Sequence, residues 1–107
     1  MSTSKDYLTY FLEELSDIPD ITYRAMMGEY IIYYREKVIG GLYDNRFLIK
    51  AVPTAISFIE NPVFESPYQG AKDMIRIEEL DSSYLRELFD EMFEELPLPK
   101  RKKNNNF

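Results

Sequence analysis

Between residues 22 and 51 the chain holds four short segments typical of β-strands, and only a few residues separate each segment from the next. Gly28 lies in the first gap and permits a tight turn, and Arg35, Glu36 and Lys37 make a polar second gap. The third gap, residues 44–45, is Asp-Asn, a pair that tolerates the positive φ of a two-residue hairpin. Connections this short join antiparallel neighbours, so the sequence predicts a meander of four strands at residues 22–26, 30–34, 38–43 and 47–51.

An amphipathic helix is predicted on the N-terminal side of this meander. Thr3 and Asp6 have the spacing of a capping box, and Pro19 ends the segment. Its apolar residues recur at helical spacing: Tyr7, Leu8, Phe11, Leu12, Leu15 and Ile18.

The C-terminal half predicts two more helices and one more strand. Pro53 begins a short helix, residues 61–73 have the composition of a loop, and residues 74–78 alternate like a strand. Asp81 is placed as the N-cap of the last helix, whose apolar stripe comprises Leu85, Leu88, Phe89, Met92, Phe93 and Leu96. The order α-β-β-β-β-α-β-α predicts an α+β fold, an antiparallel sheet with helices packed on it.

The length of 107 residues predicts a single domain. We assign residues 1–99 to this domain and expect the basic, Asn-rich segment 100–107 to be disordered. The N-terminus lacks the apolar core of a signal peptide, and the longest apolar run, residues 30–34, is far short of a membrane span. We therefore expect a cytoplasmic protein without a membrane partner.

The chain contains neither Cys nor His. This composition excludes disulfides, thiol nucleophiles, catalytic triads and imidazole-ligated zinc. Adjacent carboxylates such as Glu13 and Glu14 point in different directions and do not converge as a catalytic pair does. The sequence predicts a non-enzymatic protein with no cofactor and no metal site.

Residues 30–34 are apolar on both faces of their predicted strand. Tyr30, Ile32 and Tyr34 share one face, and with Tyr43 they form a candidate surface for a protein partner or a homodimer. Cover by the chain's own helices is the competing interpretation.

Two further groups of cations are candidates for binding anions. Arg24, Lys50 and Lys72 lie in or beside predicted strands and form a candidate anion contact, although we favour ordinary ion pairing for them. Lys100, Arg101, Lys102 and Lys103 form the alternative, a contact to nucleic acid through the tail. Without these four residues the chain has 9 basic and 19 acidic residues, a net charge of −10 that repels phosphate backbones.

Gly40 and Gly41 are the one glycine pair in the sequence. The pair lies within a predicted strand and lacks the spacing of a nucleotide-binding loop. A β-bulge or a close approach of two backbones is the expected reason for it.

The segment 24–33, Arg-Ala-Met-Met-Gly-Glu-Tyr-Ile-Ile-Tyr, resembles the TfoX N-terminal domain family, also called TfoX/Sxy. The resemblance continues through Ile39-Gly40-Gly41-Leu42-Tyr43, the strand that ends in Lys50, and the loop element Pro67-Tyr68. It covers about residues 5–96 and implies a small α+β domain of the secretion-chaperone-like type.

The resemblance also implies a link to the regulation of natural competence, and the family has no established catalytic residues. The resemblance implies that members of the namesake's type carry a second, C-terminal helical domain, and we expect no such domain in this chain of 107 residues. We therefore expect a non-enzymatic regulatory or protein-binding module whose partner the sequence does not name.

Overall fold

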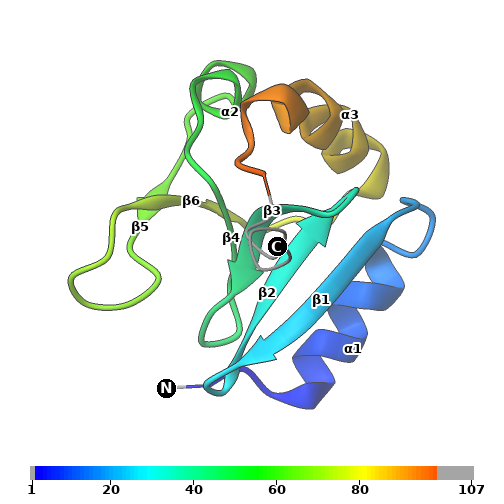
Figure 1. The fold of residues 1–107 in the computed structure, drawn as a ribbon, viewed down its shortest axis with the longest axis vertical. Helices are drawn as coiled ribbons and strands as arrows, with labels where there is room; N and C mark the ends of the chain where they lie inside the picture. Colours follow the sequence, from blue (N-terminus) through cyan, green and yellow to red (C-terminus); the bar gives the residue numbers. More distant parts are fainter. Residues whose placement is uncertain (1, 99–107) are drawn as a thin grey trace, which may run out of the picture.

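The computed structural model describes residues 2–98, which form one antiparallel sheet covered by helices (Figure 1). The strands lie in the order β1-β2-β3-β4-β6-β5, and the meander of the first four is confirmed. This is the predicted α+β fold. In chain order the elements are α1 (Lys5–Glu14), β1 (Ile21–Met26), β2 (Glu29–Tyr34), β3 (Lys37–Leu42), β4 (Phe47–Ile49), α2 (Pro53–Phe58), β5 (Phe64–Glu65), β6 (Met74–Ile77), α3 (Ser82–Met92) and the 3-10 turn η1 (Phe93–Glu95).

The two faces of the sheet differ in what covers them. The ring centre of Phe47 on β4 lies 4.8 Å from the ring centre of Phe11 on α1 and 6.3 Å from that of Phe89 on α3. We call this the helix-covered face. Strand register places on it, in one row with Phe47, the residues Ala25, Tyr30, Leu42 and Ile77. The neighbouring row lies on the other side, called the opposite face, and comprises Arg24, Ile31, Gly41, Leu48 and Arg76.

All three hairpins of the meander have two-residue turns with positive φ. Met27 and Gly28 have φ of 51° and 85°, and the Arg35-Glu36 and Asp44-Asn45 pairs also have positive φ. This conformation matches the twist of the flanking strands. The turns at Gly28 and Asp44-Asn45 are as predicted, whereas the second turn is one residue shorter because Lys37 already belongs to β3.

Both expectations for the glycine pair are confirmed. The register between β2 and β3 shifts beside Ile32, where the step from Gly40 to Val38 leaves Ile39 as the extra residue of a bulge. A Cβ on Gly40 would lie 2.1 Å from the carbonyl oxygen of Leu48. Glycine is therefore needed where β3 approaches β4.

The helix ends show one correction. The N-cap of α1 is Ser4, whose hydroxyl accepts a hydrogen bond from the Tyr7 amide, and not Thr3. Thr3 instead donates its hydroxyl to Glu29 over 2.7 Å and is buried between the first and third hairpin turns. Asp81 caps α3 as predicted, by accepting from the Tyr84 amide over 3.2 Å.

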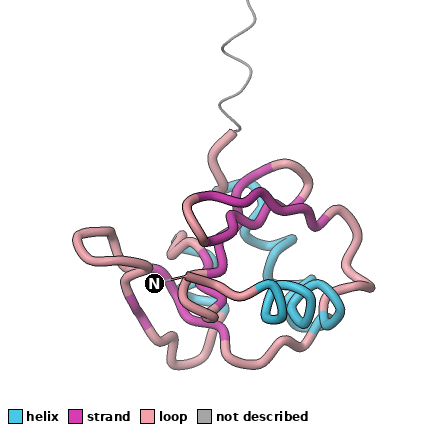
Figure 2. The backbone as a smooth tube through the Cα atoms, turned by 90° about the horizontal axis from the view of Figure 1, so that it is seen from below, coloured by secondary structure: helices cyan, strands magenta, loops and turns pink. Residues whose placement is uncertain are grey.

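The segment 61–73, predicted as a loop, contains the two-residue strand β5. β5 pairs with β6 and forms the far edge of the sheet from β1. Part of the connection between β5 and β6 projects from the body in both views of the backbone (Figures 1 and 2). Only the pairing with β6, which is distant in sequence, makes residues 64–65 a strand.

Candidate functional site

The first strand of the meander, β1, is an exposed edge of the sheet. It pairs with β2 on one side and has no neighbouring strand on its other side among residues 2–98. After Ile21, which is partly buried, every residue of β1 is exposed. β1 is therefore a long strand with one side open to another chain.

The hydrogen-bond pattern shows which backbone groups face this free edge. The Arg35 amide donates to the Asp20 carbonyl over 3.0 Å, which makes Asp20 a residue whose backbone points toward β2. Backbone direction alternates along a strand, so Thr22, Arg24 and Met26 also point toward β2. The N–H and C=O groups of Ile21, Tyr23 and Ala25 consequently point outward along the free edge.

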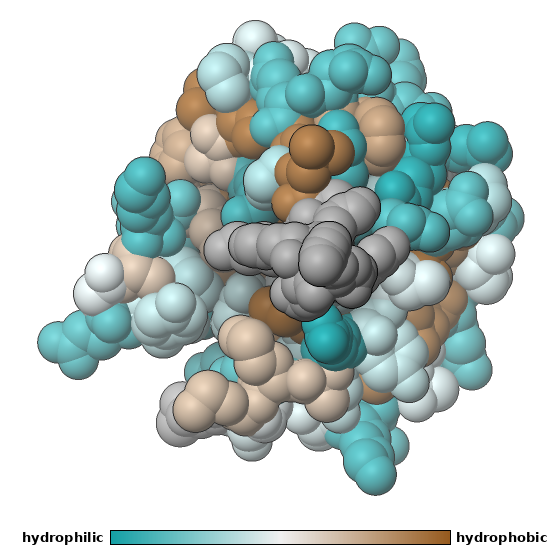
Figure 3. Space-filling model, viewed as in Figure 1, coloured by the Kyte–Doolittle hydropathy of each residue, from teal (hydrophilic) through white to brown (hydrophobic). Residues whose placement is uncertain are grey.

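Large apolar side chains accompany these open backbone groups. Tyr23 is 47% exposed, and its ring meets that of Tyr30 edge-to-face at 5.7 Å. At the hairpin tip Met26 is 45% and Met27 92% exposed, and Met27 adopts positive φ. Figure 3 shows moderately hydrophobic surface at the lower end of the molecule, where Figure 1 places the tip of the β1–β2 hairpin. Such surface is typical of protein contacts.

An open hollow of about 330 Å³ lies at the start of β1. Among residues 2–98, Asp20, Thr22, Arg35 and Glu36 line it, and they contribute two carboxylates and one guanidinium. The guanidinium carbon of Arg35 also lies 4.2 Å from the centre of the Phe93 ring. The hollow is therefore an acidic recess beside the free edge of β1.

The centre of the opposite face is closed by the β5–β6 connection. Tyr43 is only 8% exposed and its ring lies over Gly41, where a Cβ would come within 2.6 Å of it. Its ring also lies 6.4 Å from that of Tyr68, and the neighbouring Pro67 is buried. Leu48, which pairs with Gly41 in the same row, is fully buried. The predicted Pro67-Tyr68 element thus serves as a lid on the sheet.

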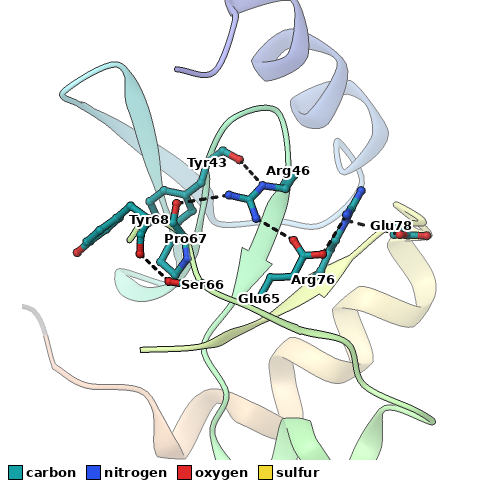
Figure 4. Close-up of polar contacts among 8 residues, drawn as sticks. All are labelled: Tyr43, Arg46, Glu65, Ser66, Pro67, Tyr68, Arg76 and Glu78. Atoms are coloured by element: carbon teal, nitrogen blue, oxygen red, sulfur yellow. Dashed lines mark hydrogen bonds and ion pairs between the residues drawn. The ribbon is translucent and has the colours of Figure 1, made fainter. Parts of the chain in front are cut away.

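A cluster of charges fastens this lid (Figure 4). Arg46 donates to the Glu65 carboxylate over 2.8 Å, to the Tyr43 carbonyl over 3.1 Å and to the Pro67 carbonyl over 3.4 Å. Arg76 donates to the other oxygen of Glu65 over 3.1 Å. These hydrogen bonds from Arg46 and then Arg76 hold the pKa of Glu65 below its ordinary value. The arginine donors are used within the chain, so the cluster is a structural clamp.

The predicted partner surface is corrected by the structure. Ile32, Tyr34 and Tyr43 are 0%, 2% and 8% exposed, and Tyr30 is partly buried. Ile32 and Tyr34 pack under the helices, and Tyr43 lies beneath the lid on the opposite face. Helix cover, the competing interpretation, is what the structure has for Ile32 and Tyr34, whereas a loop covers Tyr43. β2 is an inner strand without an exposed residue, which agrees with its apolar character on both faces.

The three cations of the predicted anion contact do not converge. Arg24 is on β1 and Lys50 follows β4, with β2 and β3 between them. Three strand spacings amount to about 14 Å. Lys72 is exposed in the β5–β6 connection, beyond β4. Ion pairing does not account for Arg24 either, because it makes no ion pair within residues 2–98.

The other predicted candidates concern the tail and the membrane. Lys100, Arg101, Lys102 and Lys103 lie outside the described residues, so a contact between the tail and nucleic acid stays a prediction. Within residues 2–98 no helix has the length and apolar character that crossing a bilayer requires.

Sequence reasoning missed the free edge of β1. The signal was present, because the first strand of a meander has one neighbour unless another segment joins it. Thr22 and Arg24 also give this strand one polar face, unlike residues 30–34.

Comparison with known proteins finds a clear relative. A protein of Spirochaeta aurantia, described as "Uncharacterized 12.7 kDa protein in trpE 5'region", is 38% identical to this chain over 73 residues. The match covers 68% of this chain and 64% of that protein. No protein-family model matches the chain, and no solved structure matches it.

Proposed function

We propose that this chain is a non-enzymatic module that binds proteins by accepting an additional strand at the free edge of β1. The observation that carries the proposal is the row of outward N–H and C=O groups on Ile21, Tyr23 and Ala25, on a strand that is exposed from residue 22 onward. Strand addition to an open sheet edge is a recurrent mode of peptide recognition, in which main-chain hydrogen bonds supply affinity and side chains supply selectivity.

The side chains of β1 support this mode of binding. Natural proteins usually shorten or cover their edge strands, because open edges attract other chains. Here the edge strand spans six residues, Ile21–Met26, with Tyr23 and Met26 exposed. The other edge strand of the sheet, β5, is only two residues long and therefore leaves fewer backbone groups open than β1 does. Of the two edge strands, β1 is thus the better docking strand.

The biological setting we propose is regulatory. The resemblance of residues 24–50 and Pro67-Tyr68 to the TfoX N-terminal domain family supports this assignment, as does a composition without Cys or His. In this proposal the chain acts by holding another protein and performs no chemistry itself.

The test uses a proline that removes one outward donor. Ala25→Pro deletes an N–H that faces the free edge and leaves the hydrogen bonds between β1 and β2 in place. The full chain, tagged, is used as bait in lysate of its native host, beside Ala25→Pro and the control Tyr10→Lys, which alters a 49% exposed tyrosine on α1.

We expect specific partners to be retained by the wild type and by Tyr10→Lys and to be lost from Ala25→Pro. Circular dichroism and thermal unfolding check that the proline variant is folded. Retention of the same partners by folded Ala25→Pro would refute binding at this edge.

A further inference from the structure

We propose that the free edge of β1 pairs with β1 of a second copy of this chain, in an antiparallel register centred on Tyr23. This inference rests on the proposed function and names the occupant of the edge. The result is a continuous sheet across two protomers related by a two-fold axis.

Backbone geometry selects this register. In an antiparallel pair the outward residues of one strand must meet outward residues of the other. Centring on Tyr23 places Tyr23 opposite the partner's Tyr23, and Ile21 opposite the partner's Ala25. All of the outward N–H and C=O groups of Ile21, Tyr23 and Ala25 are then paired. A shift of two residues in either direction leaves some of these groups unpaired.

Charge argues against one of the two shifted registers. The register shifted toward the C-terminal end of β1 places Arg24 directly opposite the partner's Arg24, and like charges in that position are destabilising. In the Tyr23-centred register Arg24 lies opposite the partner's Thr22. The charge of Arg24 therefore disfavours the C-terminal shift, and the outward groups left unpaired disfavour the N-terminal one.

The acidic recess completes the match. Thr22 lines the hollow of about 330 Å³, together with Asp20, Glu36 and Arg35. A residue opposite Thr22 lies on the same face of the sheet, so the guanidinium of Arg24 is brought to the recess of the other protomer. Arg24, which makes no ion pair within residues 2–98, would meet the Asp20 carboxylate there, and symmetry makes the contact twice.

Tyrosine contacts add to the strand pairing. Tyr23 already meets Tyr30 edge-to-face at 5.7 Å on the helix-covered face. Opposite residues of a hydrogen-bonded pair have Cα atoms about 5.5 Å apart, so the two Tyr23 rings become neighbours. An aromatic cross-strand pair contributes modestly to the free energy of association. An interface made of one strand from each protomer is small, and small interfaces are typical of weak complexes. The dimer should form in the micromolar range.

Sedimentation equilibrium of the full chain from about 1 µM to several hundred micromolar measures the association. We expect a monomer–dimer equilibrium that Tyr23→Lys and Ala25→Pro weaken at least about tenfold, because the former brings two ammonium groups together at the two-fold axis. Tyr10→Lys is the matched control, since Tyr10 and Tyr23 are 49% and 47% exposed. It should associate as the wild type does.

Single cysteine substitutions report which residues of the two protomers lie opposite each other, because the chain has no cysteine of its own. In a glutathione redox buffer Tyr23→Cys should form an intermolecular disulfide readily, since a separation of about 5.5 Å suits the bond. Thr22→Cys and Arg24→Cys should not, because their equivalents lie on diagonals of about 7–8 Å. Preferential cross-linking through Thr22→Cys or Arg24→Cys overturns the Tyr23-centred register.

Failure of this inference can be told from failure of the proposed function. A strict monomer at several hundred micromolar overturns self-pairing. If lysate partners are then still lost from Ala25→Pro, the edge binds a different protein. If the chain neither associates nor retains an Ala25→Pro-sensitive partner, both proposals are refuted.

Discussion

Replacing Tyr34 by phenylalanine tests whether this residue belongs to the interior of the domain. Tyr34 is 2% exposed, and its ring packs 5.6 Å from Phe89 and 6.2 Å from Phe93. Its hydroxyl donates a hydrogen bond to the Asp90 carboxylate of α3. Tyr34→Phe keeps the ring contacts and removes this bond between β2 and α3, so its effect isolates the bond.

The structure gives the expected size of the effect. A hydrogen bond to a charged group contributes about 1.5–3 kcal/mol. Asp90 is an exposed residue, so its carboxylate is rehydrated once the hydroxyl is gone, and the lower end of this range applies. We expect Tyr34→Phe to lower the free energy of unfolding by about 1.5 kcal/mol at neutral pH.

The difference should depend on pH in the alkaline range. Burial, and next the bond to Asp90, raise the pKa of Tyr34 from 10.0 to about 12. The unfolded chain therefore loses this proton first, and the stability that the neutral phenol provides declines as pH rises from 10 toward 12. The decline is at most about 1.4 kcal/mol per pH unit, less where solvent screens the Asp90 end. The phenylalanine variant lacks this proton, so the wild type's advantage should vanish before pH 12.

Urea denaturation of both proteins from neutral pH to about pH 12 measures this difference. A double-mutant cycle with Asp90→Ala separates the pair from the two single changes, with an expected coupling of about 1–2 kcal/mol. A coupling below about 0.5 kcal/mol, or a wild-type advantage that stays constant through the alkaline range, would refute the reasoning.

Three further outcomes follow from the contacts. Gly40→Ala should lower the free energy of unfolding, measured by urea denaturation, by at least about 3 kcal/mol, because the new Cβ meets the Leu48 carbonyl. Gly70→Ala, at positive φ but in open space, should lower it by only about 1 kcal/mol, and equal losses would contradict this reasoning. Glu65→Gln should raise amide exchange of the β5–β6 connection at neutral pH, and the wild type should lose that protection as pH falls below 4.5 through the lowered pKa of Glu65; unchanged protection factors would argue against the clamp. If the tail binds nucleic acid, truncation after residue 99 should abolish gel-shift binding whose log K falls with log salt at a slope of about −3 for single strands, and binding that survives truncation would assign it to the folded body.

Local sequence was sufficient to predict most of the elements. The short turns at Gly28 and Asp44-Asn45 require antiparallel neighbours, and the apolar stripe from Leu85 to Leu96 requires a helix that packs on something. Turn geometry and hydrophobic period depend on residues close in sequence, so a single sequence contains them.

The segments that cover the two faces of the sheet could not be predicted in the same way. Residues 30–34 are apolar on both sides, and the alternation of a strand says which side chains share a face but not what lies above it. Pro67 and Tyr68 return over Tyr43 from more than twenty residues away. The clamp between Arg46 and Glu65 joins the same distant segments.

Residues within a few positions of one another account for the meander, its tight turns, the bulge at the glycine pair and the amphipathic helices. The packing of the folded domain is what makes Tyr34 internal, makes residues 64–65 a strand and leaves β1 with an open edge. These outcomes depend on which distant segments pack together, and that choice is made by the burial of apolar surface across the whole domain.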